Sequence, residues 1–131
     1  MKKSGILNPA ILEVVASLGH TQYLVLCDAG LPIPPGKKVI DISLTSGIPS
    51  FMDVLNAVLP ELAVESYIAA GEITAKNPEL YSALEESLKG VAGTSVPHEE
   101  FKKITERAVA FIRTGECSPY ANIILVGGVN F

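Results

Sequence analysis

The sequence predicts a single α/β domain in which a mainly parallel sheet is flanked by helices, giving three layers. Helical and extended patterns alternate along all 131 residues, as in parallel sheets covered on both faces. Residues 23–27 are apolar at every position, which is typical of a strand buried on both sides. No composition break or internal repeat divides the chain, so we expect residues 1–131 to form one domain.

All four expected helices begin at a proline that precedes an apolar stripe, and the first three are as follows. Asn8 and Pro9 supply an N-cap and a proline at the first helical position, and Asn77 and Pro78 repeat this signature. Pro49 opens the helix between them, which stops at Pro60. These three helices are expected over residues 9–18, 49–59 and 78–89.

A fourth helix is expected to begin at Pro97 and to continue until Gly115. Its inward face is predicted to carry four apolar residues at helical spacing, namely Phe101, Ile104, Ala108 and Phe111. Between the helices, short apolar runs bounded by turn residues predict strands. The expected strands cover residues 23–27, 39–42, 64–69, 91–96 and 122–126.

Charge and hydropathy exclude several classes of partner. The net charge of −4 and the pI near 5.1 argue against nucleic-acid binding, because no basic cluster compensates for them. Only 18% of the residues are charged and the mean hydropathy is +0.37, which favours an oligomer that hides part of this apolar surface. No apolar run reaches the ~18 residues of a membrane span, so we expect a cytoplasmic protein with no membrane partner.

The two cysteines, Cys27 and Cys117, lack the spacing of a metal site. Cys27 lies within the apolar strand, where a free thiol behaves as a small hydrophobic group. We therefore expect no disulfide, no catalytic thiol and no bound metal. Motifs for nucleotides and for nucleophilic serine are also missing from the sequence.

The candidate functional residues stand at the ends of the predicted elements. His20 and Asp28 bracket the apolar strand, and Asp28 lies at its carboxyl end, where ligands of α/β sheets bind. His20 fits either an exposed C-capping residue or a general acid or base. His98 fits either a surface residue of the first helical turn or a ligand contact, and Lys102 shares its helix face.

Tyr120 and Asn122 come directly before the last strand. A phenol and an amide are good partners for sugar hydroxyls, and the same residues also stabilise tight turns. Residue chemistry alone therefore indicates a small polar ligand, no metal and no nucleotide.

Four segments of the chain resemble the ribose pyranase family, relatives of the fucose mutarotases. They are LGHT at 18–21, CDAGLPIP at 27–34, GIPSF at 47–51 and RTGECSPYANIIL at 113–125. The resemblance implies interconversion of the pyranose and furanose forms of D-ribose without a cofactor, supplying ribose for uptake and phosphorylation. It implies that His20 is the proton donor and that five residues bind sugar: Asp28, His98, Tyr120, Ala121 and Asn122. It also implies a homodecamer of stacked pentamers.

One geometric point goes beyond the resemblance. At ~3.3 Å per residue, the eight positions from His20 to Asp28 span up to roughly 26 Å, far more than one ribose. Either residues 21–22 fold His20 back, or His20 serves the site of a neighbouring subunit, which we favour. Three other functions stay open: a mutarotase for fucose or another sugar, a non-catalytic ribose-binding accessory of a transport system, and a structural scaffold.

Overall fold

The computed structural model describes all 131 residues and contains five helices and six strands. The helices are α1 (Pro9–Ser17), α2 (Phe51–Val58), α3 (Ile73–Lys76), α4 (Pro78–Ser87) and α5 (His98–Thr105). The strands are β1 (Tyr23–Cys27), β2 (Lys38–Asp41), β3 (Val64–Ala70), β4 (Ala92–Val96), β5 (Ala110–Arg113) and β6 (Ile123–Gly127). None of the helices combines the length and apolar character that a membrane crossing requires.

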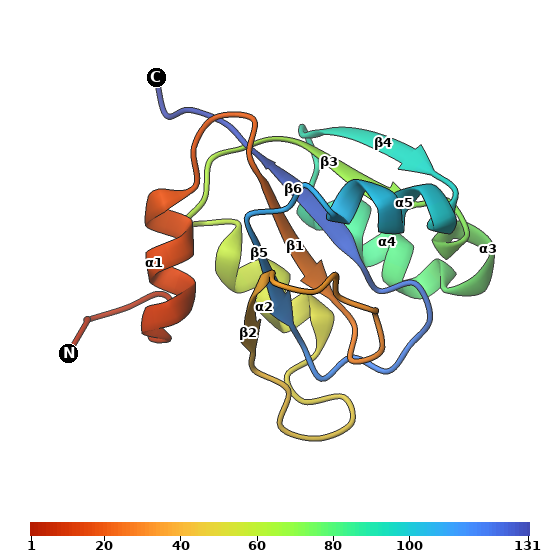
Figure 1. Cartoon of the computed structure of the whole chain (residues 1–131), viewed down its shortest axis with the longest axis horizontal. Helices are drawn as coiled ribbons and strands as arrows, with labels where there is room; N and C mark the ends of the chain where they lie inside the picture. The colour runs from red at the N-terminus through yellow and green to blue at the C-terminus, as the bar shows by residue number, and fades with distance from the viewer.

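The six strands form one sheet in the order β2-β5-β1-β6-β3-β4 (Figure 1). β6 is antiparallel to both of its neighbours, β1 and β3, whereas all other neighbours are parallel. Five strands therefore run in one direction and β6 alone runs in the other. The prediction of a mainly parallel sheet is confirmed.

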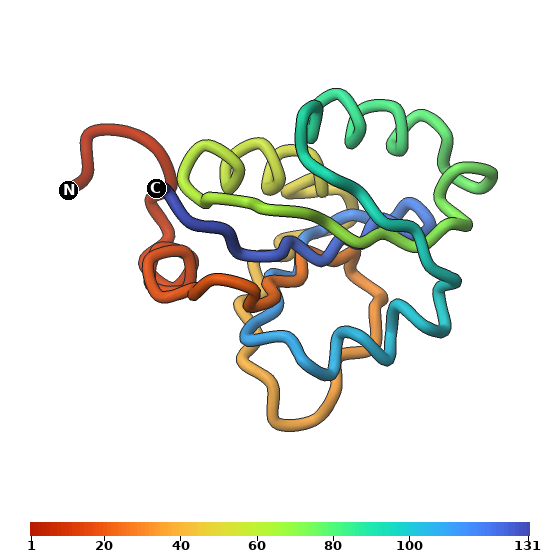
Figure 2. The backbone as a smooth tube through the Cα atoms, turned by 90° about the horizontal axis from the view of Figure 1, so that it is seen from above, coloured from red at the N-terminus to blue at the C-terminus, as the bar shows by residue number.

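Helices cover both faces of this sheet, so the domain has three layers (Figure 2). Leu24 and Leu26 of β1 join the larger core cluster, to which α1, α2, α3 and α4 contribute. Val25 and Cys27 point to the opposite face and join a smaller cluster with Phe101 of α5. The alternation follows from the two-residue period of a strand and explains why this segment is apolar throughout.

The prediction of one long helix from Pro97 to Gly115 is wrong. The helix ends at Thr105, and Ala110–Arg113 form β5, which lies between β2 and β1 in the sheet. The apolar spacing was misleading because it fits both geometries: Phe101 and Phe111 pack in the same cluster, one from a helix and one from a strand. Pairing with two parallel neighbours overrides the helical period here.

Helix starts show two further differences from the sequence prediction. α2 begins at Phe51 rather than at Pro49, and its N-cap Ser50 forms a capping box with Asp53. Asn77 does not cap α4 with its side chain, although Pro78 begins the helix as predicted. The short helix α3 was missed, since four residues give too little periodicity to detect.

Replacing Phe111 by Ala tests how much the burial of β5 contributes to stability. Its side chain is fully buried, so the variant is expected to lose about 3–5 kcal/mol in the free energy of unfolding. Leu44→Ala is the control, because Leu44 is 79% exposed and its loss is expected to cost less than about 0.5 kcal/mol. Urea unfolding followed by circular dichroism measures both values, and equal stability of the two variants would contradict the burial of Phe111.

Candidate functional site

The two residues that bracket β1 lie at opposite edges of the sheet. Asp28 follows β1 at the edge where β1, β3, β4 and β5 end, which we call the carboxyl edge. His20 precedes β1 at the other, amino edge. Because β6 runs the opposite way, its first residues meet the carboxyl edge and its last residues meet the amino edge.

A pocket of about 210 Å³ opens at the carboxyl edge, and we call it the carboxyl-edge pocket. Four predicted site residues meet here although the sequence separates them widely. The lining consists of Asp28, Gly30, Leu31, Pro32, His98, Pro119, Tyr120 and Asn122.

Asp28 and Asn122 hold each other in place through a two-way interaction. The Asp28 backbone N–H donates to Asn122 Oδ1 at 2.9 Å, and Asn122 Nδ2 donates to Asp28 Oδ2 at 2.9 Å. Asp28 Oδ1 accepts a third bond, from the Gly30 N–H at 2.9 Å. Asn122 is 1% exposed, so this amide needs a partner inside the protein, and the Asp28 carboxylate is oriented toward the pocket by fixed donors.

Tyr120 enters the pocket from a strained backbone position. Its φ of 58° lies in the left-handed region, which non-glycine residues rarely adopt. The Asn122 N–H donates to the Tyr120 carbonyl at 2.9 Å, which closes a three-residue turn. Asn77, between α3 and α4, supports this turn, since its Nδ2 donates to the Pro119 carbonyl and to Ser118 Oγ, both at 2.9 Å. Such strain is concentrated at ligand sites, where the surroundings determine the geometry.

The His98 ring is fixed between two aromatic rings. Its centroid lies 6.2 Å from Phe101, with nearly parallel planes, and 5.1 Å from Tyr120, edge to face. Both oxygens of the Glu72 carboxylate accept from the His98 backbone N–H, at 2.9 and 3.1 Å. His98 Nδ1 is buried and has no hydrogen-bond partner. A buried polar atom without a partner is uncommon in proteins, so this nitrogen is a feature that a ligand contact of His98 would have to explain.

Two other candidates lie differently. Ala121 is fully buried and packs in the larger core cluster, so only its main chain is available to a ligand. Lys102 is not among the residues that line the carboxyl-edge pocket. Its ammonium lies 2.8 Å from the Glu99 carboxylate and lowers the pKa of that carboxyl by donating a hydrogen bond to it.

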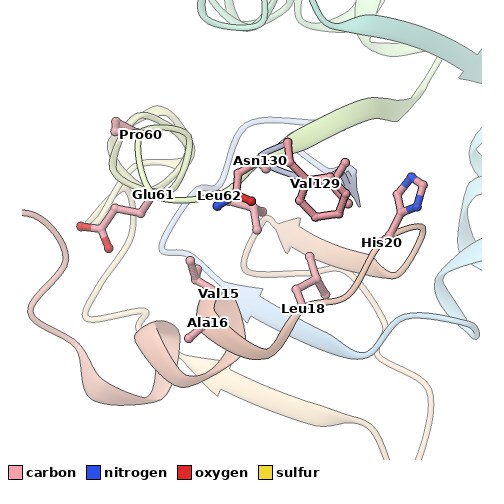
Figure 3. A pocket seen from close by; sticks show the side chains of 12 residues that line it. Val15, Ala16, Leu18, His20, Pro60, Glu61, Leu62, Val129 and Asn130 are labelled. Carbon is pink, nitrogen blue, oxygen red and sulfur yellow. The ribbon is translucent and has the colours of Figure 1, made fainter.

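His20 lies in a separate cleft of about 640 Å³, which we call the amino-edge cleft. Figure 3 shows His20 on the turn after α1, at one end of a row of side chains that has Glu61 and Pro60 at the other end. β1 alone is roughly 17 Å long at ~3.3 Å per residue, so one sugar cannot reach both sites. Residues 21–22 therefore do not fold His20 back to Asp28.

Three positioning contacts were not visible in the sequence. The Glu65 carboxylate bonds to His20 Nε2, Glu72 holds the His98 backbone, and Asn77 holds residues 118–119. Each joins residues at least 26 positions apart, and no local pattern encodes such contacts.

Neither cysteine forms a disulfide, and Cys27 is buried in the core. Burial, and secondarily the negative charge of Asp28, raise the pKa of the Cys27 thiol to about 12, so it stays protonated. Nowhere do three His, Cys, Asp or Glu side chains lie close enough together to hold a metal ion.

Comparison with known proteins gives one consistent result. The model of the RbsD / FucU transport protein family matches residues 1–130. A protein named D-ribose pyranase from Geobacillus kaustophilus is 52% identical over 131 residues, which cover all of this chain and 96% of that protein. Another of that name, from Symbiobacterium thermophilum, is 51% identical over 131 residues and the full length of both chains.

Solved structures share the fold. The structure of Bacillus subtilis RbsD complexed with D-ribose superposes with a TM-score of 0.97 at 49% identity, over the full length of both chains. The fucose mutarotase from Streptococcus pneumoniae, in complex with L-fucose, gives a TM-score of 0.86 at 24% identity, also over both full lengths. At this lower identity the likeness concerns the fold alone.

Substituting Asn122 tests the two-way bond with Asp28. Asn122→Ala is expected to lower the free energy of unfolding by about 2–4 kcal/mol, since it removes one neutral bond and one to a charged group. Asn130→Ala serves as the control, because Asn130 is exposed and makes no hydrogen bond, so it is expected to change stability by less than ~0.5 kcal/mol. Chemical denaturation gives both values, and a negligible cost for Asn122→Ala would contradict the pairing.

Proposed function

The chain belongs to the RbsD / FucU transport protein family, and on this premise we propose that it is an isomerase that interconverts the pyranose and furanose forms of D-ribose. The observation that carries the proposal is 51–52% identity, over the whole chain, with proteins named D-ribose pyranase. The 49% identity with the RbsD that was solved in complex with D-ribose supports the same substrate. The fucose mutarotase is more distant, at 24% identity.

The reaction needs only proton transfers and positioning. When the pyranose opens, the electron pair of the bond between the anomeric carbon and the ring oxygen moves to that oxygen, which takes a proton. The anomeric hydroxyl loses a proton and becomes the carbonyl. Reclosure through the neighbouring hydroxyl reverses these transfers and gives the furanose. The protein therefore needs one acid/base group and anchors for the sugar hydroxyls, and it needs no cofactor.

We assign the anchoring role to the carboxyl-edge pocket. The Asp28 carboxylate accepts hydrogen bonds from sugar hydroxyls, and its orientation is supported by Asn122 and the Gly30 N–H. Tyr120 and His98 line the same pocket and add a phenol and an imidazole to it. Ala121 takes part through its main chain. Fixed anchors of this kind hold the open-chain form so that reclosure occurs on either hydroxyl.

His20 is assigned the acid/base role, on a neighbouring subunit's pocket. Two observations support this: His20 lies at the edge of the sheet opposite Asp28, and its cleft is bordered by exposed Val129 and Phe131. Apolar surface beside a functional histidine favours contact with a second copy. We propose a ring-shaped homo-oligomer, with stacked pentamers as its form, that unites the two edges.

The two unpaired cysteines support work in a reducing compartment, so we place the enzyme in the cytoplasm, where it supplies furanose for ribose catabolism. The description of the family as transport proteins favours one second function, that of a non-catalytic ribose-binding accessory. The two functions predict different effects of removing His20, because only an isomerase would lose the exchange between ring forms.

Replacing His20 by Ala separates catalysis from binding. We expect the exchange between ribose ring forms to fall by ~10²–10⁴-fold, the usual contribution of general acid–base catalysis, while ribose binding persists because the pocket residues are intact. Saturation-transfer NMR measures the exchange and calorimetry measures the binding. Undiminished exchange would exclude His20 as the acid/base, and a wild-type protein that binds ribose without exchanging it would be an accessory. A panel of sugars in the same assay defines the substrate.

Mixing two inactive variants tests the shared site. His20→Ala keeps the carboxyl-edge pocket, and Asp28→Asn keeps the histidine. The two variants are unfolded together and refolded in equal amounts, so that they assemble at random. If the histidine and the pocket of one site come from different subunits, each is intact in half of the sites, and both are intact in about one quarter of them. Exchange activity is then expected to return to about a quarter of the wild-type value. Activity that never returns in mixed oligomers would place both groups in one subunit.

A further inference from the structure

The His20 side chain forms one hydrogen bond, and its partner is the carboxylate of Glu65. Its Oε2 bonds to His20 Nε2 across 45 positions of sequence, from the start of β3 to the turn before β1. The two side chains are 50% and 51% exposed. An exposed histidine–carboxylate contact by itself contributes little and is a common feature of protein surfaces. The surrounding backbone distinguishes this pair from such a case.

Glu65 occupies an irregularity in the sheet. Val64 pairs with Gly127 and Ser66 pairs with Val126, so Glu65 is the extra residue of a β-bulge on β3. A bulge turns a side chain away from its regular direction and is frequent beside functional sites. Gly128 holds the chain next to the bulge, since its N–H donates to the Ala63 carbonyl at 2.8 Å. The bulge therefore fixes the direction in which the Glu65 carboxylate leaves the strand.

The turn that carries His20 is held as firmly. Gln22 N–H donates to the Gly19 carbonyl at 3.1 Å, and Thr21 between them has a φ of 67°, an unfavourable value for a β-branched residue. Thr21 N–H donates to Gly127 O, and Gly127 N–H donates to Gln22 O, both at 2.8 Å. A side chain at Gly127 would lie 2.5 Å from the Gly19 carbonyl, so only glycine fits.

We propose that Glu65 is the positioning residue of His20, an inference that rests on the proposed function. Its carboxylate accepts the Nε2–H, so the neutral ring carries its proton on Nε2 and leaves Nδ1 free. Nδ1 takes the proton of the anomeric hydroxyl and returns it to the ring oxygen. The negative charge of Glu65 stabilises the imidazolium formed between these steps, and Glu65 itself neither gains nor loses a proton. The bulge and the strained turn hold the two side chains within hydrogen-bond distance of each other.

The test measures kcat and KM for ring exchange in Glu65→Gln and Glu65→Ala. The control is Glu86→Gln, because Glu86 is exposed and its side chain makes no hydrogen bond or ion pair. Removing the partner of a metal-bound histidine typically costs ~10–100-fold, and we expect the same scale here, in kcat with KM unchanged. Glu65→Ala is expected to lose more than Glu65→Gln, whose amide oxygen still accepts a hydrogen bond. Glu86→Gln is expected to match the wild type.

Two readouts separate positioning from a purely structural role. In a His20→Ala background, Glu65→Gln is expected to cause no further loss, because it acts through the absent ring, whereas a structural role gives additive losses. In ¹⁵N NMR of the neutral His20 ring, the wild type is expected to carry its proton on Nε2, and Glu65→Ala to show a mixture of both tautomers. An additive double variant, or an unchanged tautomer in Glu65→Ala, overturns the inference. If the wild-type protein itself catalyses no ring exchange, the proposed function is wrong, whatever the role of Glu65.

Discussion

The reversed direction of β6 is the constraint on which both candidate sites depend. If this strand ran parallel to its neighbours, residues 120–122 would lie at the amino edge, away from Asp28 and His98. Instead β6 begins at the carboxyl edge, where Asn122 meets Asp28, and ends at the amino edge, where Gly127 ties the turn of His20. All five residues of β6 are buried between two neighbouring strands and two layers. A one-residue slip would turn every side chain to the wrong face, so the register is strongly determined.

This arrangement makes the pocket a product of tertiary structure rather than of one motif. The Asp28 carboxylate is oriented by Asn122, the turn at Tyr120 is held by Asn77 between α3 and α4, and His98 is held by Glu72 before α3. In each of these contacts, a residue from another part of the chain holds a residue of the pocket in place. The positive φ of Tyr120 persists because these surrounding bonds determine it.

The sequence predicts much of the fold because its local signals agree with the global structure. β1 matches its expected range, and Pro9 and Pro78 begin helices as expected, since proline at the first helical turn costs no hydrogen bond. β5 was mistaken for helix because the position of Phe111 fits both the helical spacing and a buried strand. Only the pairing of β5 with β1 and β2 distinguishes the two structures. The grouping of Asp28, His98, Tyr120 and Asn122 was implied by the family resemblance and not by their places at element ends, because it depends on the reversed direction of β6. Glu65 was not predicted, because a bulge depends on strand pairing that no local pattern records.

With the proposed roles of His20 and Asp28, the length of one strand leaves the site of a single subunit incomplete. A sheet separates its two edges by the length of its strands, here roughly 17 Å for β1, whereas acid–base catalysis needs hydrogen-bond distances. If the carboxyl-edge residues anchor the sugar and His20 is the acid/base, as we propose, the two reach those distances only between copies. Under the same proposal, the rigid features at the amino edge have a role. A group that serves another subunit gains no orientation from its own pocket, so its turn, its partner carboxylate and the glycine beneath it must fix it beforehand.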